Sequence, residues 1–362
     1  MTGAHRIYER VVLTGAAGWL GRGILHRLSG GDDADAVSPP IAADVRIRSL
    51  VLPGQEMPQA ATLGANVEVC AGDLTNPQVC ADLCRDMSGG LVLHVAGVIH
   101  PRRVAEFQAV NVDGTRKLLQ AAAAAGMAKA VVLSSNSPCG CNPTRDDLFV
   151  ESSPYRPYMG YGRSKMLMEQ LVARIRDGGG LATTVIRAPW FYGPFQPPRQ
   201  TLFFRMIRDG RAPIVGDGQN RRSMAYIGNL VDGIMLAARS TAADGQTYWI
   251  ADARPYTMEE IITTVERLME EEFGIACRHG RLRLPSFVSD VAQAADFVIQ
   301  SLGMYNQKIH VLSEMNKTIA CSIARARAEL GYEPRIALEE GMRRSLRWLL
   351  AADPQAMADS RG

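Results

Sequence analysis

The chain has 362 residues, of which 47% are hydrophobic and 21% are charged, a composition typical of a folded globular protein. This length favours one large α/β domain with a smaller lobe. The net charge is only +3, and the basic residues are scattered along the chain. We therefore expect a small-molecule substrate and no nucleic-acid partner.

Membrane and metal partners are not expected either. No apolar run approaches the roughly 20 residues of a membrane-spanning helix, and the opening MTGAHRIYERVVLTG lacks the pattern of a signal peptide. We predict a cytoplasmic protein. The seven cysteines are an odd number and suit reduced thiols. Cys80 with Cys84 and Cys139 with Cys141 have no nearby histidine and lack zinc-site spacing, so we predict no metal site.

Short β-branched runs alternate with longer helical stretches over the first two thirds of the chain. This alternation predicts parallel strands joined by helical crossovers, that is, a Rossmann-type doubly wound parallel sheet in an α/β fold. The expected strands cover residues 11–14, 45–52, 67–71, 91–96, 130–134 and 183–187, and the expected helices cover 20–29, 78–87, 104–125 and 161–177. Residues 30–44 are rich in Asp, Ala and Pro and are interpreted as a surface insertion.

The alternation ends after residue 188, where a proline-rich loop precedes a helical stretch at 202–209. Helical apolar spacing returns at residues 285–315, 322–330 and 339–350. We predict a dinucleotide-binding domain at residues 1–188, to which residues 225–253 return. Residues 189–224 and 254–350 are expected to form a smaller, mostly helical C-terminal substrate lobe, and residues 351–362 a disordered tail.

A glycine-rich segment at residues 14–21, TGAAGWLG, lies between an apolar strand and a helix. Gly15 permits a tight turn, Gly18 lets the backbone approach a pyrophosphate, and Gly21 allows the helix to pack closely on the strand. The phosphates would then meet the helix N-terminus, where unpaired N–H groups favour negative charge. We expect this segment to bind a dinucleotide.

The spacing TGxxGxxG resembles that of the extended short-chain dehydrogenase/reductase family, within the NAD-dependent epimerase/dehydratase superfamily. Further matches follow in order: GDL at 72–74, HVAG at 94–97, NVDGT at 111–115, RAP at 187–189, YGP at 192–194 and YIGNLVD at 226–232. The resemblance covers residues 8–350 and implies a nicotinamide cofactor. It places these residues at that cofactor: Gly15, Ala17, Gly18, Trp19, Leu20, Gly21, Asp73, Leu74, Ala96, Gly97, Asn111, Tyr161, Lys165 and Pro189.

The end of the second expected strand decides between NAD and NADP. An acid there would bind the adenosine ribose of NAD, whereas a basic residue would favour the 2′-phosphate of NADP. The sequence from Ser49 to Pro53 offers neither, and Arg48 and Arg22 are the nearby guanidinium candidates. The cofactor is NAD or NADP, and the missing acid favours NADP.

Tyr161 and Lys165 lie four residues apart, on one face of an expected helix. A tyrosine has a reference pKa near ~10, and a nearby positive charge stabilises its phenolate. Tyr161 can then act as general acid or base while hydride moves to or from the nicotinamide. Of three nearby tyrosines, Tyr155 and Tyr158 lack a lysine at this spacing.

A serine at the end of the fifth expected strand completes the catalytic group. In the family a serine or threonine stands five residues before a loop glycine, and counting back from Gly140 gives Ser135 rather than Ser134. The resemblance implies that its hydroxyl binds the reacting oxygen. The next residues, Asn136 and Ser137, are candidate substrate contacts, and Cys139 stands where the family often has tyrosine.

The sequence is compatible with three functions. The first is a ketoreductase or hydroxyl dehydrogenase similar to the 3β-hydroxysteroid dehydrogenase and dihydroflavonol reductase branch, which the NLVD segment at 229–232 favours. The second is a nucleotide-sugar epimerase, in which Arg222 after the GDG segment at 216–218 would meet a diphosphate. The third is a cofactor-binding module without catalysis, which Ser135, Tyr161 and Lys165 together disfavour. We predict the oxidoreductase, and the resemblance implies a homodimer.

Overall fold

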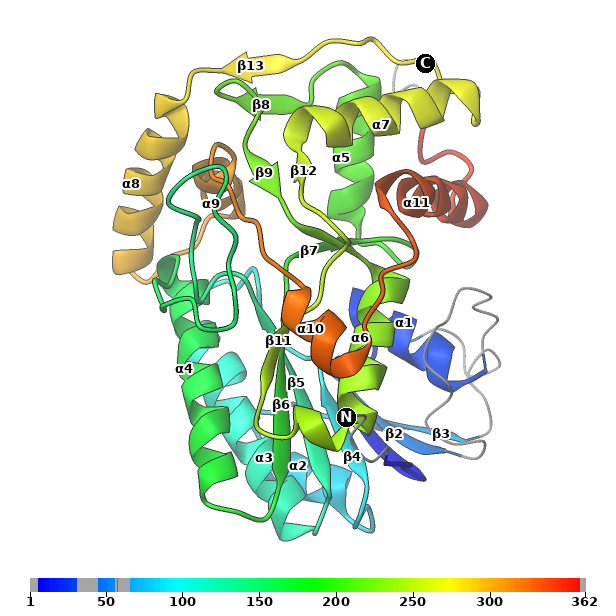
Figure 1. Ribbon diagram of the computed structural model, residues 1–362, viewed down its shortest axis with the longest axis vertical. Coiled ribbons are helices and arrows are strands. Elements are labelled where there is room, and N and C mark those ends of the chain that lie inside the picture. The colour runs from blue at the N-terminus through cyan, green and yellow to red at the C-terminus, as the bar shows by residue number, and fades with distance from the viewer. Residues whose placement is uncertain (1–5, 31–44, 56, 58–65, 359–362) are drawn as a thin grey trace.

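The computed structural model describes residues 6–30, 45–55, 57 and 66–358. A seven-stranded sheet with the order β11-β6-β5-β4-β1-β2-β3 fills the lower half of Figure 1. Every neighbouring pair in it is parallel, which confirms the predicted doubly wound Rossmann-type fold. Its strands are β1 (Arg10–Thr14), β2 (Arg46–Val51), β3 (Val67–Ala71), β4 (Leu91–His94), β5 (Lys129–Ser135), β6 (Ala182–Ala188) and β11 (Thr247–Trp249).

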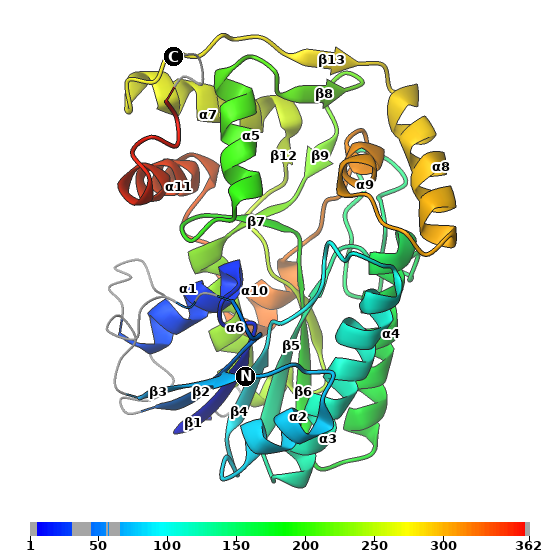
Figure 2. The same cartoon turned by 180° about the vertical axis from the view of Figure 1, so that it is seen from behind.

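Helices cover both faces of this sheet because side chains alternate along each buried strand. Val12, Val92 and Val132 pack into one apolar cluster, whereas Val11 and Leu93 pack into another. The first face carries α2 (Pro77–Cys84), a π-helix (Phe107–Gly114), α3 (Thr115–Ala124) and α4 (Met159–Asp177); the second carries α1 (Trp19–Leu28) and α6 (Ile227–Arg239) (Figures 1 and 2). The predicted insertion at 30–44 falls almost wholly outside the described residues.

The remaining elements form a second lobe above the carboxyl ends of the strands (Figure 1). Its helices are α5 (Pro198–Arg208), α7 (Met258–Glu271), α8 (Phe287–Ser301), α9 (Gln307–Glu314) and α11 (Leu338–Ala352). Three small sheets pair β7 (Trp190–Tyr192) with β10 (Met224–Tyr226), β9 (Arg221–Arg222) with β12 (Tyr256–Thr257), and β8 (Pro213–Val215) with β13 (Leu282–Leu284). Within the described ranges, no helix is both long and apolar enough to cross a membrane.

Two C-terminal segments lie elsewhere than expected. Helix α10 (Ala324–Leu330) packs on α6 and β11 of the sheet domain (Figure 1) rather than in the lobe. The phenol of Tyr332, just after α10, donates a 2.9 Å hydrogen bond to the carbonyl of Ala251. Apolar helical spacing shows that a face is buried but not which partner buries it.

The end of the chain is also held in place, up to the last described residue. Arg205 and Arg208 of α5 donate to the carbonyls of Ala356 and Met357 at 2.6 and 2.7 Å, and both of these apolar residues are buried. Residues 356 and 357 therefore lie against α5 in the structure, whereas we expected a disordered tail at 351–362. Small and polar residues predominate in this tail, so its sequence does not indicate that Ala356 and Met357 are buried.

Candidate active site

The glycine-rich loop joins β1 to α1 in a conformation that side chains would block. Gly15 has a φ of +75°, and a Cβ there would lie 2.8 Å from the backbone nitrogen of Ala96. A Cβ on Gly21 would lie 2.0 Å from the carbonyl oxygen of Gly15. Gly18 is exposed and caps α1 without a side-chain hydrogen bond. The first turn of α1 thus has no side-chain cap, and a helix start of this kind can bind the pyrophosphate of a dinucleotide.

Trp19 connects this loop to the second lobe. Its indole nitrogen donates a 2.7 Å hydrogen bond to the carbonyl of Pro194, and its ring packs 5.1 Å from that of Phe191. Leu20 is buried in the core, and the Ala17 carbonyl accepts a bond from Arg22 at 3.1 Å. The cofactor loop is therefore fixed on both sides of its turn.

The predicted adenine contacts follow β3. Asp73 is exposed, and its Oδ1 accepts a 2.8 Å bond from the backbone of Thr75. The cap of α2 is Asn76 instead, which accepts from the Gln78 nitrogen at 2.9 Å. Leu74 is buried. Asp73 is thus available to a ligand, whereas Leu74 supports the loop from beneath.

Arg48 does not lie where a 2′-phosphate could use it. Its side chain is buried, with Nε 3.0 Å from Glu68 Oε2 and an Nη1 bond of 2.7 Å to the carbonyl of Arg85. This guanidinium joins β2 to β3 and to the end of α2, so one of the two candidates for the phosphate is removed. Residues 49–55, which follow, carry no acid.

A buried histidine that the sequence analysis did not single out lies under the cofactor loop. His94 Nδ1 lies 2.7 Å from Thr14 Oγ1, and Nε2 lies 2.8 Å from Thr115 Oγ1. Burial, and to a lesser extent the charge of Lys165, lowers the pKa of His94 to about 3. The neutral ring therefore ties β1 and β4 to the helix that follows Asn111.

Asn111 lies on the π-helix, a form that often marks functional sites. Its Oδ1 accepts from the Val98 nitrogen at 2.8 Å, and its Nδ2 donates to the Val98 carbonyl and to Ser164 Oγ, both at 3.0 Å. A Cβ on Gly97 would lie 3.2 Å from Asn111 Oδ1 and 3.3 Å from Lys165 Nζ. Gly97 thus lets the loop after β4, with Ala96, approach α4 closely.

The structure brings Ser135, Tyr161 and Lys165 to the end of β5. Burial raises the pKa of Tyr161 to about 12, and the Ser135 hydrogen bond and the positive charge of Arg199 oppose this increase. Lys165 donates a 2.9 Å bond to the carbonyl of Leu133, and burial lowers its pKa to about 8. The expected cation beside the phenol was Lys165. In the described structure the guanidinium of Arg199 has this effect, because Lys165 is directed to the strand.

The neighbouring serines have different partners. Ser134 donates to Glu169, which also accepts a 2.7 Å bond from Arg187 and a 2.8 Å bond from the Tyr155 phenol. Ser135 Oγ instead lies near the next two residues, 3.3 Å from Asn136 Oδ1 and 3.4 Å from Ser137 Oγ. Only Ser135 is directed to the side of Tyr161, as the count from Gly140 suggests.

The other predicted contacts are spread around the carboxyl end of the sheet. Pro189 is buried directly after β6. Arg222, on β9, donates to the carbonyl of Glu314 at the end of α9. The charge of Glu314 also raises the pKa of Tyr161. Arg222 therefore holds α9 near the site, and this contact occupies part of its guanidinium.

An aromatic wall, which the sequence did not reveal, lies beside Tyr161. The ring of Phe107 is 5.9 Å from Tyr161 and 5.8 Å from Tyr305, and His100 Nδ1 lies 2.8 Å from the Tyr305 phenol oxygen. Burial, with the charge of Arg199 as a further cause, lowers the pKa of His100 to about 4. These rings come from 100–107 and 305, segments too far apart in sequence for a motif.

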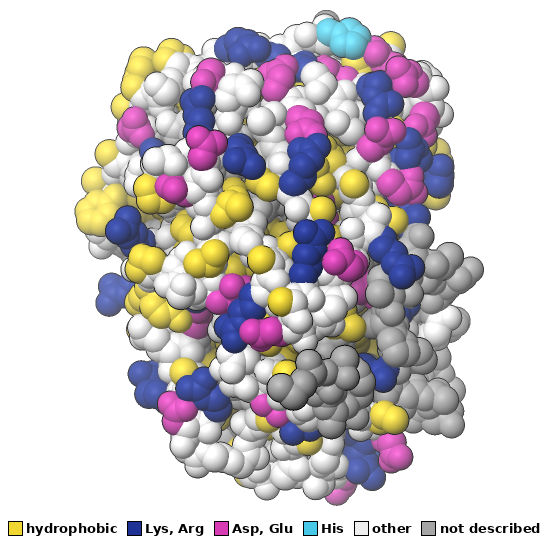
Figure 3. Space-filling model, in the orientation of Figure 1, with side chains coloured by type: hydrophobic (Ala, Val, Ile, Leu, Met, Phe, Trp, Pro, Cys, Tyr) yellow, Lys and Arg dark blue, Asp and Glu magenta, His cyan; other side chains and the backbone are white. Residues whose placement is uncertain are grey.

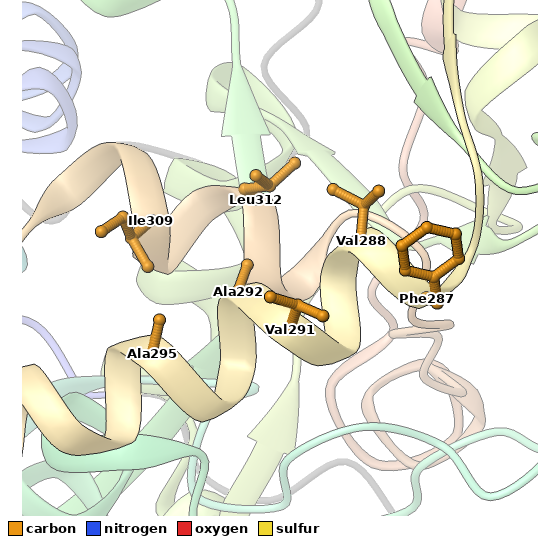
Figure 4. A pocket seen from close by; sticks show the side chains of 7 residues that line it. All are labelled: Phe287, Val288, Val291, Ala292, Ala295, Ile309 and Leu312. Carbon is orange, nitrogen blue, oxygen red and sulfur yellow. The ribbon is translucent and has the colours of Figure 1, made fainter.

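A shallow apolar groove runs between α8 and α9 (Figure 4). Both helices contribute side chains to it, namely Phe287, Val288, Val291, Ala292, Ala295, Ile309 and Leu312. Exposed hydrophobic side chains also gather over α8 at the left edge of Figure 3. The groove contains no member of the catalytic group.

The described residues contain no group of His, Cys, Asp or Glu that could hold a metal ion. The seven cysteines are free thiols. Burial is the leading cause of the raised pKa of each, and it takes that of Cys139 and Cys141 to about 11. These thiols are poor nucleophiles at neutral pH.

Comparison with known proteins places this site in a family. Residues 11–251 match the model of the NAD dependent epimerase/dehydratase family. An uncharacterised protein of Sinorhizobium fredii is 49% identical over 93% of this chain and 94% of its own length. A 4-hydroxy-2-methyl-3-oxo-4-farnesyl-3,4-dihydroquinoline-1-oxide ketoreductase of Stigmatella aurantiaca is 27% identical over 92% of this chain and 94% of its own.

Two further matches extend this result. A decarboxylating sterol-4-alpha-carboxylate 3-dehydrogenase of Saccharomyces cerevisiae is 24% identical over 94% of this chain and 98% of its own length. The solved dTDP-glucose 4,6-dehydratase of Bacillus anthracis, in complex with NAD, superposes with a TM-score of 0.74 at 17% identity, over 95% of this chain and 97% of that one. The chain belongs to the NAD dependent epimerase/dehydratase family and is an NAD(P)-dependent oxidoreductase of the extended short-chain dehydrogenase/reductase type.

Proposed function

We propose that the protein transfers hydride between NAD(P) and a ketone or its secondary alcohol, with Ser135, Tyr161 and Lys165 as the catalytic group. The observation that carries this proposal is the position of Ser135 beside the Tyr161 phenol, whose pKa it lowers, with Lys165 one turn further along α4. Two hydroxyls that converge on one point can both bind the same substrate oxygen.

The cofactor-binding loop fits a dinucleotide, because Gly15 and Gly21 let the turn and α1 pack closely where any Cβ would clash with the backbone. When bound, the nicotinamide donates or accepts the hydride. Tyr161 donates its proton to the carbonyl oxygen during reduction and takes it back during oxidation. Ser135 orients that oxygen, while Arg199 supplies the positive charge near the phenol and Lys165 is held at the carbonyl of Leu133. The raised pKa keeps the Tyr161 phenol protonated, which is the state that it needs in order to act as an acid during reduction.

The substrate class follows from the aromatic wall and from the relatives. Phe107 and Tyr305 give the reacting end of the site an apolar side. The names of the relatives in Stigmatella and in yeast describe a farnesylated quinoline and a sterol. We therefore propose a fused-ring or isoprenoid-bearing ketone or alcohol. Asn136 and Ser137 would contact it near the reacting carbon.

The cofactor-binding residues stay as predicted: the glycine loop, Asp73, Leu74, Ala96, Gly97, Asn111 and Pro189. NADP is the favoured form because residues 52–55, directly after β2, contain no acid. Arg22 is then the remaining guanidinium candidate for the phosphate. We also propose a cytoplasmic homodimer, in which the π-helix and α4 regions meet their copies.

The test begins with protein purified without added cofactor. Denaturation and mass spectrometry show whether NAD(H) or NADP(H) is retained. Protein that is empty, binds NADPH reversibly and oxidises it with a fused-ring ketone supports the proposal. Stoichiometric retained NAD, with no net oxidation by ketones, would instead support the nucleotide-sugar epimerase, since a redox-neutral enzyme regenerates its cofactor.

A further inference from the structure

Arg199, the second residue of α5, has no hydrogen bond or ion pair with any part of the chain that the structure describes. Its one described contact places the guanidinium 5.9 Å from the centre of the Trp19 ring. Most of the nearby lobe arginines are paired: Arg205 and Arg208, on the same helix, bind backbone carbonyls. Arg199 is thus a cation whose hydrogen-bonding capacity is unused.

The position of Arg199 links the cofactor loop to the reacting phenol. Trp19 is the first residue of α1, and the charge of Arg199 acts on Tyr161 and on His100. Surrounding protein lowers the pKa of Arg199 through desolvation, yet its side chain is accessible to solvent. Because the guanidinium of Arg199 is partly desolvated by surrounding protein and its side chain is still exposed, we infer that it lines a concave part of the surface.

Two buried amides near Arg199 also lack partners. Gln196 is 6% exposed, and neither polar atom of its side chain has a hydrogen bond with a described residue. Gln200 is 2% exposed, and its Nε2 is likewise unpaired there. Buried polar atoms are nearly always paired, so each exception calls for a reason such as a ligand. Three polar groups within residues 196–200 thus have no partner among the described residues, and a polar ligand at the start of α5 would supply one.

We propose that Arg199 binds an anionic oxygen group of the substrate, a carboxylate or a phosphate, close to the carbon that reacts at Tyr161. This inference rests on the proposed function and makes the substrate amphiphilic, with an apolar skeleton and one acidic group. A guanidinium binds either group through two parallel, charge-assisted hydrogen bonds. The name of the yeast relative describes a sterol that carries a carboxylate.

The bound anion would also affect proton transfer. Unoccupied, Arg199 opposes the increase in the pKa of Tyr161. An anion on the guanidinium neutralises this effect, so the phenol keeps its proton until a carbonyl oxygen is in place. Arg199 is therefore a binding residue, and an anion bound to its guanidinium keeps Tyr161 protonated and able to act as an acid.

The first experiment labels arginines with phenylglyoxal in protein saturated with NADPH and maps them by mass spectrometry. The probes are acetoacetate, its neutral methyl ester and inorganic phosphate. We expect acetoacetate or phosphate to slow labelling of Arg199 by about 10-fold, as a charge-assisted contact predicts, and the ester to have no effect. Protection by acetoacetate alone identifies a carboxylate, and protection by phosphate alone a phosphate.

Two outcomes overturn the proposal. Full protection of Arg199 by NADPH alone would assign it to the cofactor pyrophosphate, and labelling that no anion slows would show that Arg199 binds none. Because this readout needs no turnover, it succeeds or fails independently of the proposed hydride transfer.

A variant pair provides the second test, with Arg163, an exposed residue of α4, as the matched control. Ligand-observed NMR measures acetoacetate binding to each protein loaded with NADPH. We expect Arg199→Met to weaken this binding about 10-fold and to leave NADPH affinity unchanged, while Arg163→Met changes neither. Equal acetoacetate affinity in both variants would refute the role of Arg199.

Discussion

Ser134 and Ser135 are adjacent on β5 but belong to two different polar clusters. Ser134 donates to Glu169, whose carboxylate also holds Arg187 at 2.7 Å, and all three are buried. Ser135 instead lies near the Tyr161 phenol, whose pKa both Ser135 and the charge of Arg199 lower. In the first cluster a carboxylate meets a guanidinium. In the second, the guanidinium of Arg199 has no carboxylate partner among the described residues.

The difference shows how one strand end can serve both stability and chemistry. Both Glu169 and Tyr161 lie on α4, so a single residue step along β5 separates a paired, closed cluster from an unpaired, accessible one. A buried ion pair whose hydrogen bonds are all satisfied fixes the local geometry but has few free donors or acceptors for a ligand. The cluster with unused donors is the one that can gain from a ligand.

The largest expected effect comes from the open cluster. Tyr161→Phe removes the proton donor, so we expect turnover to fall about 10³-fold while NADPH affinity is retained. Tyr155→Phe, which removes a phenol from the closed cluster, serves as the matched control and should keep most of the turnover. Steady-state kinetics and fluorescence titration measure both variants. Unchanged turnover in Tyr161→Phe would refute the proposed chemistry.

The closed cluster should affect folding instead. Arg187→Met leaves the Glu169 carboxylate buried without its cation, and we expect the free energy of unfolding to fall by about 3–5 kcal/mol. Arg176→Met, which removes an exposed ion pair with Asp177, should cost less than about 1 kcal/mol. Denaturant titration decides between them. Equal stability of the two variants would show that the closed cluster does not stabilise the fold.

The serines test the division within one strand. Ser135→Ala removes a hydrogen bond to the reacting oxygen, so we expect turnover to fall about 10²-fold with little change in stability. Ser134→Ala should instead cost about 1–3 kcal/mol of stability and leave turnover close to normal. The reverse pattern would exchange the roles of the two residues.

A smaller effect concerns the pH dependence of stability. Burial lowers the pKa of Lys165 from 10.5 to about 8, so between these two values the unfolded chain binds the proton that the folded protein has released. The contribution of Lys165 to stability therefore rises with pH from about 8 to 10.5 and is constant below that window. Subtracting the unfolding curve of Lys165→Met isolates this slope. A flat difference across the window would contradict the buried, weakened base.

Local patterns were enough to predict the sheet and the glycine-rich turn after β1. Gly15 and Gly21 could be identified because a strand, a turn and a helix follow one another in a fixed order. The helix expected at 104–125 is a π-helix at Phe107–Gly114 followed by α3, a difference in hydrogen-bond register that apolar spacing cannot show. Nothing in the sequence singled out Arg199, because an isolated arginine in a segment expected to be a proline-rich loop belongs to no motif or periodic pattern.

Contacts between distant segments account for the other omissions. The Glu169–Arg187 pair joins a helix to a strand, and the aromatic wall joins Phe107 to Tyr305. The family resemblance suggested Ser135 and Tyr161 but not their surroundings, since those depend on how the lobe closes over the sheet.

The edge strand β11 has a consequence for the order of folding. It pairs with β6, although the chain forms part of the lobe between the two. Lys129, fully buried on β5, binds the carbonyls of Ala237 and Ser240, each at 2.8 Å, at the end of α6. A growing polypeptide therefore exposes the β6 edge and an unpaired lysine until about residue 250 has left the ribosome. During that interval the unpaired edge leaves the nascent chain open to mispairing.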